Sequence, residues 1–298
     1  MIKTTEKTVA RHGFWFYILE DGSILWYTVF RYERTGLNMK IYEIMNDIIG
    51  VEFLECRDGW CVDGLKYGDP DAEVTKVATC LTATPDVIRA AGEWGAQLLI
   101  THEPTFGSHL DDERETELSR AKMKLLDEAG LTVYRWHDST HFRAGDKIGE
   151  SFIAHLEWKG TFNGDMDFVL DEPKTPLQIA KEISEKLGLK HPRIVGRRDG
   201  EVTRLNLSLG ARGSDPYTAL RTDDHEVAIA GEVCEWYDGE PIRDLAQMGA
   251  QKTLIILGHA GSERDGMADL ADNINANYSD KGISAKYFEC GELYTYAD

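Results

Sequence analysis

The sequence of 298 residues is poor in basic residues. Lys and Arg together number 33, Asp and Glu number 52, and the formal net charge is −19. Binding to nucleic acid or to an anionic membrane needs a basic patch that offsets such a charge. The densest basic cluster is Arg193, Arg197 and Arg198, which we interpret as a solvated turn. The charge therefore argues against nucleic acid and membrane partners, and it suits solubility and divalent cations.

The sequence also lacks an unbroken apolar run and a cysteine framework. Its one long apolar stretch, residues 14–30, is interrupted by Glu20-Asp21-Gly22-Ser23, which predicts a hairpin and neither a membrane span nor a signal peptide. The five cysteines form no Cys-x-x-Cys pair, so we expect no disulfide framework, no four-thiolate zinc site and a reducing cytoplasm. A Gly-x-Ser-x-Gly motif, a phosphate-binding loop and a dinucleotide fingerprint are absent too.

The composition that remains is that of a packed globular protein, with 42% hydrophobic and 29% charged residues. Residues 1–38 precede a segment, Met39–Met45, that resembles an ordinary protein start. We treat them as an N-terminal extension, which is either an added hairpin or a start assigned too far upstream. Lobe one is expected at residues 39–150, completed by residues 245–298, and lobe two at residues 151–244.

Short apolar runs alternate with helical patterns after residue 39, which predicts an α/β fold around mostly parallel sheets. Helix starts are marked by Thr84-Pro85-Asp86 and Thr175-Pro176, and Gly188 marks a helix end. Strands are predicted at residues 75–82, 97–101, 131–136, 205–209, 227–230, 253–257 and 285–288. Further helices are predicted at residues 115–129, 241–248 and 265–276.

Three of the predicted strands lead into histidines that have an acidic or a second imidazole neighbour. These segments are His102-Glu103-Pro104, His137-Asp138-Ser139-Thr140-His141 and Gly258-His259-Ala260-Gly261-Ser262-Glu263. Because the carboxyl ends of parallel strands share one edge of a sheet, we expect the segments to meet in one crevice. A lone histidine at a strand end is more often a hydrogen-bonded structural residue, and buried polar residues satisfied by backbone are the alternative for the whole set.

Imidazole nitrogens and carboxylate oxygens are the donors of catalytic zinc, iron, manganese or cobalt sites, and two ions need about six of them. The three segments supply that number. The predicted metal ligands are His102, Glu103, His137, His141, His259 and Glu263. The residues therefore predict one or two divalent metal ions.

Read in order, the motifs of the chain resemble those of the Nif-three-like proteins, often named GTP cyclohydrolase one type two. The resemblance covers Met39 to the C-terminus, and Gly-His-x-x-Ser-Glu is its most specific part. It rests on Gly64–Pro70, Leu99–Pro104, Val133–His137, Leu209–Ser214, Ala230–Glu232 and Gly258–Glu263. It implies a two-lobed α/β fold with mixed, mostly parallel sheets flanked by helices. It further implies a dinuclear metal site in the cleft and ring-shaped homo-oligomers, commonly hexamers.

Two ligand positions depart from the pattern of that family. His102, His137, His259 and Glu263 match it, but Glu103 stands where the family has a second histidine. His141 stands where the family has an aspartate. The exchange keeps the number of donors, yet carboxylates bridge two metals more readily than imidazoles do, so the bridging ligand and the metal's identity stay open.

The donor set leads us to expect a metal-dependent hydrolase of a small phosphorylated or nucleotide-like molecule. Its candidate catalytic residues are Glu263 and Glu103, which would bridge or steer a water molecule, and His137, as an acid or base if it is not a ligand. Residues 210–214 would either offer N–H groups to an anion or form a tight turn. A non-catalytic metal-binding scaffold or regulatory protein is the alternative function.

Overall fold

The computed structural model describes residues 15–18, 24–27, 39–50, 61–142, 145–164, 166–213, 215–222, 225–295 and 297. Residues 1–37 and 38–298 form two separate compact units. In the first unit, β1 (Trp15–Ile18) pairs in antiparallel fashion with β2 (Ile24–Tyr27). This is the pairing that a hairpin in residues 14–30 predicts; the turn itself lies outside the described residues.

Lobe one is built on a five-stranded sheet in the order β13-β4-β5-β6-β3. Its parallel strands are β13 (Ser284–Tyr287), β4 (Lys76–Cys80), β5 (Leu98–Thr101) and β6 (Thr132–Arg135). The edge strand β3 (Gly64–Tyr67) runs antiparallel to β6. β5 and β6 are buried along their whole length, as expected for strands that are covered by helices on both faces.

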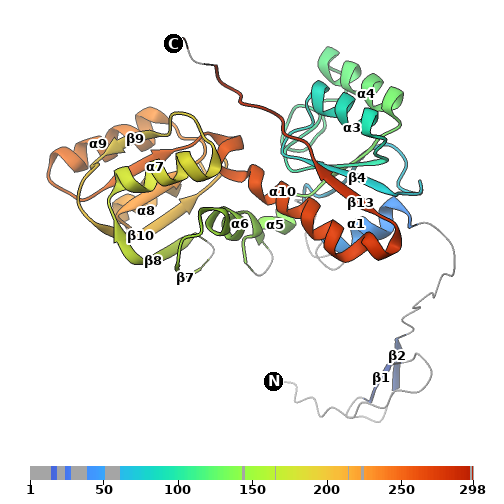
Figure 1. Ribbon diagram of the computed structural model, residues 1–298, viewed down its shortest axis with the longest axis horizontal. Coiled ribbons are helices and arrows are strands. Elements are labelled where there is room, and N and C mark those ends of the chain that lie inside the picture. The colour runs from blue at the N-terminus through green and yellow to red at the C-terminus, as the bar shows by residue number, and fades with distance from the viewer. Residues whose placement is uncertain are drawn as a thin grey trace. The chain divides into compact units, whose positions relative to one another are not determined.

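Two pairs of helices cover this sheet (Figure 1). α1 (Ile41–Ile49) and α10 (His259–Tyr278) bury their apolar side chains on one face, and α3 (Pro85–Trp94) and α4 (Glu117–Ala129) on the other. The Thr84 hydroxyl accepts a hydrogen bond from the N–H of Val87 and so caps α3, as the sequence predicts.

Lobe two contains a six-stranded sheet in the order β7-β8-β10-β11-β12-β9. Its strands are β7 (Gly160–Phe162), β8 (Asp167–Lys174), β9 (Arg193–Gly196), β10 (Val202–Ser208), β11 (Val227–Ala230) and β12 (Thr253–Ile256). β10, β11 and β12 are parallel, and the remaining pairs are antiparallel. Both lobes therefore have mixed sheets with a parallel centre.

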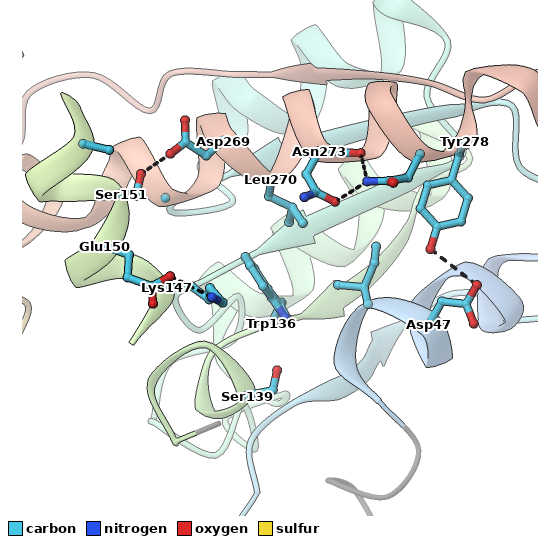
Figure 2. A pocket seen from close by; sticks show the side chains of 14 residues that line it. Asp47, Trp136, Ser139, Lys147, Glu150, Ser151, Asp269, Leu270, Asn273 and Tyr278 are labelled. Carbon is cyan, nitrogen blue, oxygen red and sulfur yellow. Dashed lines mark hydrogen bonds and ion pairs between the residues drawn. The ribbon is translucent and has the colours of Figure 1, made fainter. Parts of the chain in front are cut away.

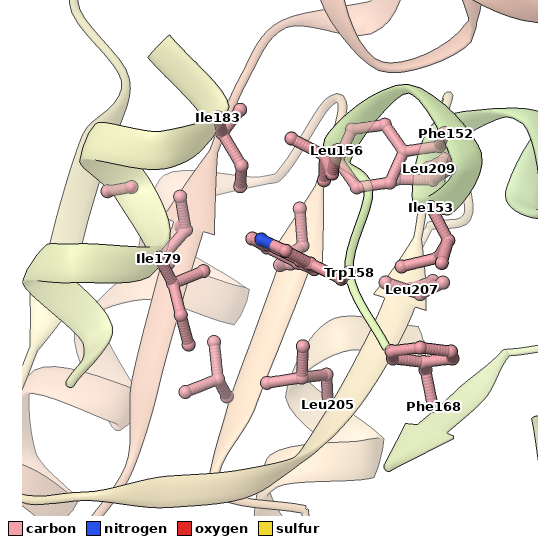
Figure 3. Packing of buried hydrophobic residues seen from close by; sticks show 14 of the residues in the cluster. Phe152, Ile153, Leu156, Trp158, Phe168, Ile179, Ile183, Leu205, Leu207 and Leu209 are labelled. Carbon is pink, nitrogen blue, oxygen red and sulfur yellow. The ribbon is translucent and has the colours of Figure 1, made fainter. Parts of the chain in front are cut away.

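Helices also flank the second sheet on both faces. α6 (Lys147–Leu156) and α7 (Pro176–Leu187) pack on one face around Trp158 (Figure 3). α8 (Asp215–Thr222) and α9 (Glu240–Gln247) pack on the other. The remaining short elements are α5 (Asp138–Phe142), the π-helix η1 (Glu235–Gly239) and the 3-10 helix η2 (Ser279–Lys281).

The topology corrects the expected lobe boundaries. β12 lies between β11 and β9, so the chain returns to lobe one after Ile256 and not at residue 245. α6 begins at Lys147 and buries Ile148 and Phe152 in the core of lobe two, ahead of the expected boundary at residue 151. The cause is the pairing and packing of these segments, which their own apolar patterns do not specify.

α10 begins six residues earlier than the predicted helix of residues 265–276. In this added first turn the Ser262 hydroxyl donates to the His259 carbonyl and accepts from the N–H of Gly210, which ties the turn to the loop after β10. Within the described part of the chain, no helix combines the length and the apolar character needed to cross a membrane.

Candidate metal centre

The three histidine segments meet, although they do not share the edge of one sheet. His102 and Glu103 follow β5, and His137 and His141 follow β6, all in lobe one. β12 belongs to the other sheet, and His259 and Glu263 lie one turn apart at the start of α10. α10 runs from the end of β12 onto lobe one (Figure 1), so its first turns bring this pair to the segments of lobe one.

Each imidazole of the cluster is held through its Nδ1 atom. The Nδ1 partners are the Trp136 carbonyl for His102 (3.0 Å), Asp138 for His137 (2.9 Å), Asp146 for His141 (3.0 Å) and Glu232 for His259 (2.9 Å). In each ring, Nε2 is therefore the nitrogen that remains to ligate a metal. Histidines that ligate metals are oriented in this way, by a carbonyl or a carboxylate on the nitrogen remote from the metal.

The Nε2 atoms of His102, His141 and His259 face a buried carboxylate, that of Glu263. Its Oε2 atom lies 3.5 Å from Nε2 of His102 and 3.1 Å from Nε2 of His259, and its Oε1 atom lies 3.9 Å from Nε2 of His141. Nε2 of His102 and Nε2 of His141 are themselves 3.3 Å apart. Among the described residues Glu263 Oε2 has no hydrogen-bond partner of good geometry. A buried carboxylate oxygen without such a partner, surrounded by ring nitrogens, fits a cation.

The donors form two overlapping groups around Glu263. Ligand atoms of His102, His137 and His141 lie within 4.8 Å of one another, and so do those of His102, Glu103 and Glu263. Glu103 Oε1 is 3.0 Å from Nε2 of His259, which brings the sixth predicted ligand into contact with the second group. All six predicted ligands thus lie together. The first group offers three nitrogen donors and the second offers nitrogen and oxygen donors, and both sets suit a divalent transition metal.

The charges within the cluster are strongly coupled. Burial lowers the pKa of His259, but the hydrogen bond to Glu103 and the close negative charges of Glu263 and Glu103 outweigh it and raise this pKa to about 11. Burial raises the pKa of Glu103, yet the hydrogen bond from His259 and the charge of His102 bring it down to about 2. For His137, burial dominates and lowers the pKa to about 4, so this imidazole is neutral at pH 7.

Several residues that position the cluster carry no site role in the sequence reasoning. The Asp63 carboxylate accepts the backbone N–H groups of His137, Asp138 and Ser139 at 2.6–2.9 Å and so fixes the turn after β6. Nothing in the local sequence marks this aspartate. Glu232 lies in the motif Ala230-Gly231-Glu232, which is part of the family resemblance, but the motif alone predicts no role for this glutamate.

The described part of the lobe-two loop, residues 210–213, contacts residues next to the cluster. Arg212 donates to Asp146 at 2.7 Å and therefore reaches the carboxylate that orients His141. The N–H of Gly210 donates to Ser262 at 2.9 Å, so it serves the turn and not an anion. At this position the tight-turn interpretation is the one that fits.

The fold and the cluster define a two-lobed α/β protein with mixed sheets and a buried His/carboxylate group that could hold a metal ion. The chain belongs to the DUF34/NIF3 (NGG1p interacting factor 3) family, whose model matches residues 39–290. This confirms the family resemblance and the fold class that the motifs predict.

Known relatives are similar over most of their length. The chain is 24% identical to a "GTP cyclohydrolase 1 type 2 homolog" of Clostridium perfringens, over 76% of this chain and 87% of the relative. A Staphylococcus aureus hypothetical protein has the same fold, with a TM-score of 0.71, 17% identity and coverage of 87% and 100% of the two chains. A Bacillus cereus protein related to NIF3 gives 0.65 and 13%, with coverage of 87% and 97%.

Proposed function

We propose that the protein is a divalent-metal-dependent hydrolase of a small phosphorylated or nucleotide-like molecule. The observation that carries this proposal is the orientation of four imidazoles: each is engaged at Nδ1, and in His102, His141 and His259 the Nε2 atom lies 3.1–3.9 Å from a Glu263 oxygen. A purely structural histidine cluster has no need of this shared orientation. The name of the Clostridium perfringens relative, which is that of a cyclohydrolase acting on a nucleotide, supports the choice of substrate class.

The residues fit two cations better than one. His102, His137 and His141 would hold one ion, Glu103 and His259 the other, and Glu263 lies between the groups because its two oxygens face different imidazoles. When bound, such ions lower the pKa of a water molecule and neutralise negative charge that develops on the substrate.

The electrostatics of the chain assign different roles to the candidate catalytic residues. Glu103, with a pKa of about 2, keeps its charge and is suited to hold a cation or orient water, but it is a weak base. His137 is neutral at pH 7 and has its Nδ1 atom fixed by Asp138, so its Nε2 is suited to ligate a cation, whereas a pKa of about 4 makes it a weak base. Glu263 is too deeply buried to act on a substrate directly and serves as the central carboxylate.

The test compares metal content and turnover in matched variants. Elemental analysis of the protein as purified is expected to find a stoichiometric divalent metal, and metal-reconstituted protein is expected to hydrolyse members of a nucleotide and phosphodiester panel. His259→Ala should abolish turnover and lower the metal content, as should Glu263→Ala. His155→Ala is the control, because His155 also bonds a carboxylate, Asp269, but takes no part in the cluster.

The outcomes separate the alternatives. Stoichiometric metal without turnover in the wild-type protein would favour the metal-binding scaffold or regulator over the hydrolase. Metal content that stays unchanged in both His259→Ala and Glu263→Ala would overturn the metal centre itself.

A further inference from the structure

A second cavity lies outside the metal centre, in lobe one and along α10. Its volume is about 650 Å³, within the usual range for small-molecule sites. α1, α5, α6 and α10 line it together with Trp136 (Figure 2). Trp136 also borders the metal centre, since its backbone carbonyl orients His102 while its indole ring forms a wall of the cavity.

Two buried hydrogen-bonding groups on this wall are unpartnered. The indole N–H of Trp136, whose residue is 9% exposed, and the hydroxyl of Ser139, 2% exposed, have no partner among the residues that the structure describes. Figure 2 shows the Ser139 hydroxyl directed toward the cavity and the Trp136 ring. A buried donor without an acceptor is costly, so two on one cavity wall indicate an acceptor that the chain does not supply.

The lining of the cavity is partly apolar and partly polar, and its ionisable side chains are mostly acidic. Ile48, Leu270 and the rings of Trp136 and Tyr278 form the apolar part. The ionisable side chains at the rim are Asp47, Glu150, Asp269 and Lys147. Lys147 is paired with Glu150 at 2.7 Å, so it does not offset the other two carboxylates.

Asp269 already accepts hydrogen bonds from Ser151 and His155. Among the residues that the structure describes, Asp47 has one long hydrogen bond, 3.4 Å from the Tyr278 hydroxyl, and its helix position leaves it exposed. Asp47 is therefore the rim carboxylate with the most capacity for a ligand. In a chain of net charge −19, this rim disfavours phosphates and carboxylates and favours an ammonium group.

We propose that this cavity binds a small aromatic molecule with a carbonyl acceptor at one end and an ammonium group at the other. The carbonyl accepts the Trp136 N–H and the Ser139 hydroxyl, the ring packs against the indole and Leu270, and the ammonium group reaches Asp47 at the rim. The aromatic walls add cation–π attraction for the same ammonium group. This site does not depend on the proposed hydrolase function.

Matched probes test the recognition of each end. The ligand is meta-(aminomethyl)benzamide, with meta-methylbenzylamine as the analogue without the carbonyl and meta-carbamoylbenzoate as the analogue with a carboxylate in place of the ammonium group. Binding is followed by titration calorimetry and by fluorine NMR of protein labelled with fluorotryptophan. Trp136→Phe identifies the Trp136 signal among those of the seven tryptophans. The amide probe is expected to bind with a dissociation constant of about 1 mM or below and to shift that signal.

The variants separate this site from general effects on the fold. Ser139→Ala should weaken the amide probe about 2- to 10-fold and leave meta-methylbenzylamine unchanged, because one hydrogen bond is lost. Asp47→Asn should weaken both ammonium probes. Ser284→Ala, at an exposed serine, and His259→Ala, in the metal centre, should bind all probes like the wild-type protein.

The proposal is overturned if no probe shifts the Trp136 signal at about ten times the expected dissociation constant. It is equally overturned if the amide and the carbonyl-free analogue bind with the same affinity, or if the carboxylate probe binds best. Each of these results would leave a cavity that holds water only.

Discussion

At the scale of single residues, the position of His259 between two carboxylates decides how the protein should take up metal. Glu103 and Glu263 lie 3.0 and 3.1 Å from its Nε2 atom, and they raise its pKa to about 11. At pH 7 the metal-free protein therefore carries a proton on this ring. A cation that binds Nε2 must displace the proton, since only the neutral imidazole is a ligand.

We therefore expect metal binding at pH 7 to release about one proton from His259. Titration calorimetry in two buffers that differ in ionisation enthalpy measures this number. His259→Gln should bind metal more weakly and release correspondingly fewer protons. Equal proton release by His259→Gln and wild-type protein would show that His259 is not displaced by the metal.

Arg135 is a second residue with a large structural role, although its place in the sequence does not indicate one. Its guanidinium group is fully buried, donates to the carbonyls of His102 and His109, and lies 3.5 Å from Asp111 and 3.9 Å from Glu103. Its positive charge thus compensates the negative charges of Asp111 and Glu103, next to the first histidine segment.

Arg135→Met should destabilise the protein by about 3–5 kcal/mol, because it leaves the buried Asp111 carboxylate without its cation. Urea unfolding measures the change. The control is Arg120→Met, which removes an exposed arginine paired with an exposed Glu115 and should cost about 0.5 kcal/mol or less. Similar losses in the two variants would refute the structural role of Arg135.

At the scale of elements, the contact between the loop after β10 and the first turn of α10 places the central carboxylate. Gly210 has a φ of +69°, and a Cβ atom there would lie 2.1 Å from Glu263 Oε1. Gly213 in the same loop also has a positive φ, +60°, but a Cβ atom there would meet nothing within 4 Å. Both glycines therefore have a left-handed backbone conformation, but Gly210, unlike Gly213, lies against Glu263.

Alanine at either glycine should cost about 1–2 kcal/mol of stability through the left-handed backbone conformation. Gly210→Ala should in addition displace the Glu263 carboxylate and lower the metal content, whereas Gly213→Ala should retain the wild-type metal content. Elemental analysis together with urea unfolding distinguishes the two effects. A normal metal content in Gly210→Ala would mean that Glu263 does not need its observed position.

At the scale of the whole molecule, the donors follow strands of both sheets in the unit formed by residues 38–298. His102 and Glu103 follow a strand of one sheet, and His259 and Glu263 follow a strand of the other. A bound cation would cross-link the two parts, in addition to the Arg212–Asp146 ion pair of 2.7 Å that already joins them.

Metal at about 100 times its dissociation constant should stabilise the protein by about 2.7 kcal/mol and raise Tm by about 5–10 °C. Thermal scans with and without a chelator test this. In His155→Ala the response should persist, and in Glu263→Ala it should vanish. A Tm that is indifferent to the chelator in metal-loaded wild-type protein would contradict a centre shared by both lobes. The hexamer that the family resemblance implies stays a prediction, to be checked by light scattering.

Much of the local structure could be predicted from the sequence, because the signals are local. Thr84 and Pro85 start α3, Thr175 and Gly188 delimit α7, and the buried strands appear as apolar runs. The candidate metal ligands were predicted in the same way: they lie in segments that follow apolar strands and that combine histidine with an acidic or a second imidazole neighbour.

Only the tertiary structure decided which sheet each strand joins and which residues position each candidate ligand. The residues of β12 do not specify its neighbours β11 and β9, because strand pairing depends on hydrogen bonds with segments distant along the chain. The positions of Asp63, Arg135 and Asp146 behind the histidines follow from the same long-range packing. The sequence by itself therefore determined which residues are candidate donors, and the long-range packing of the chain determined that they lie together.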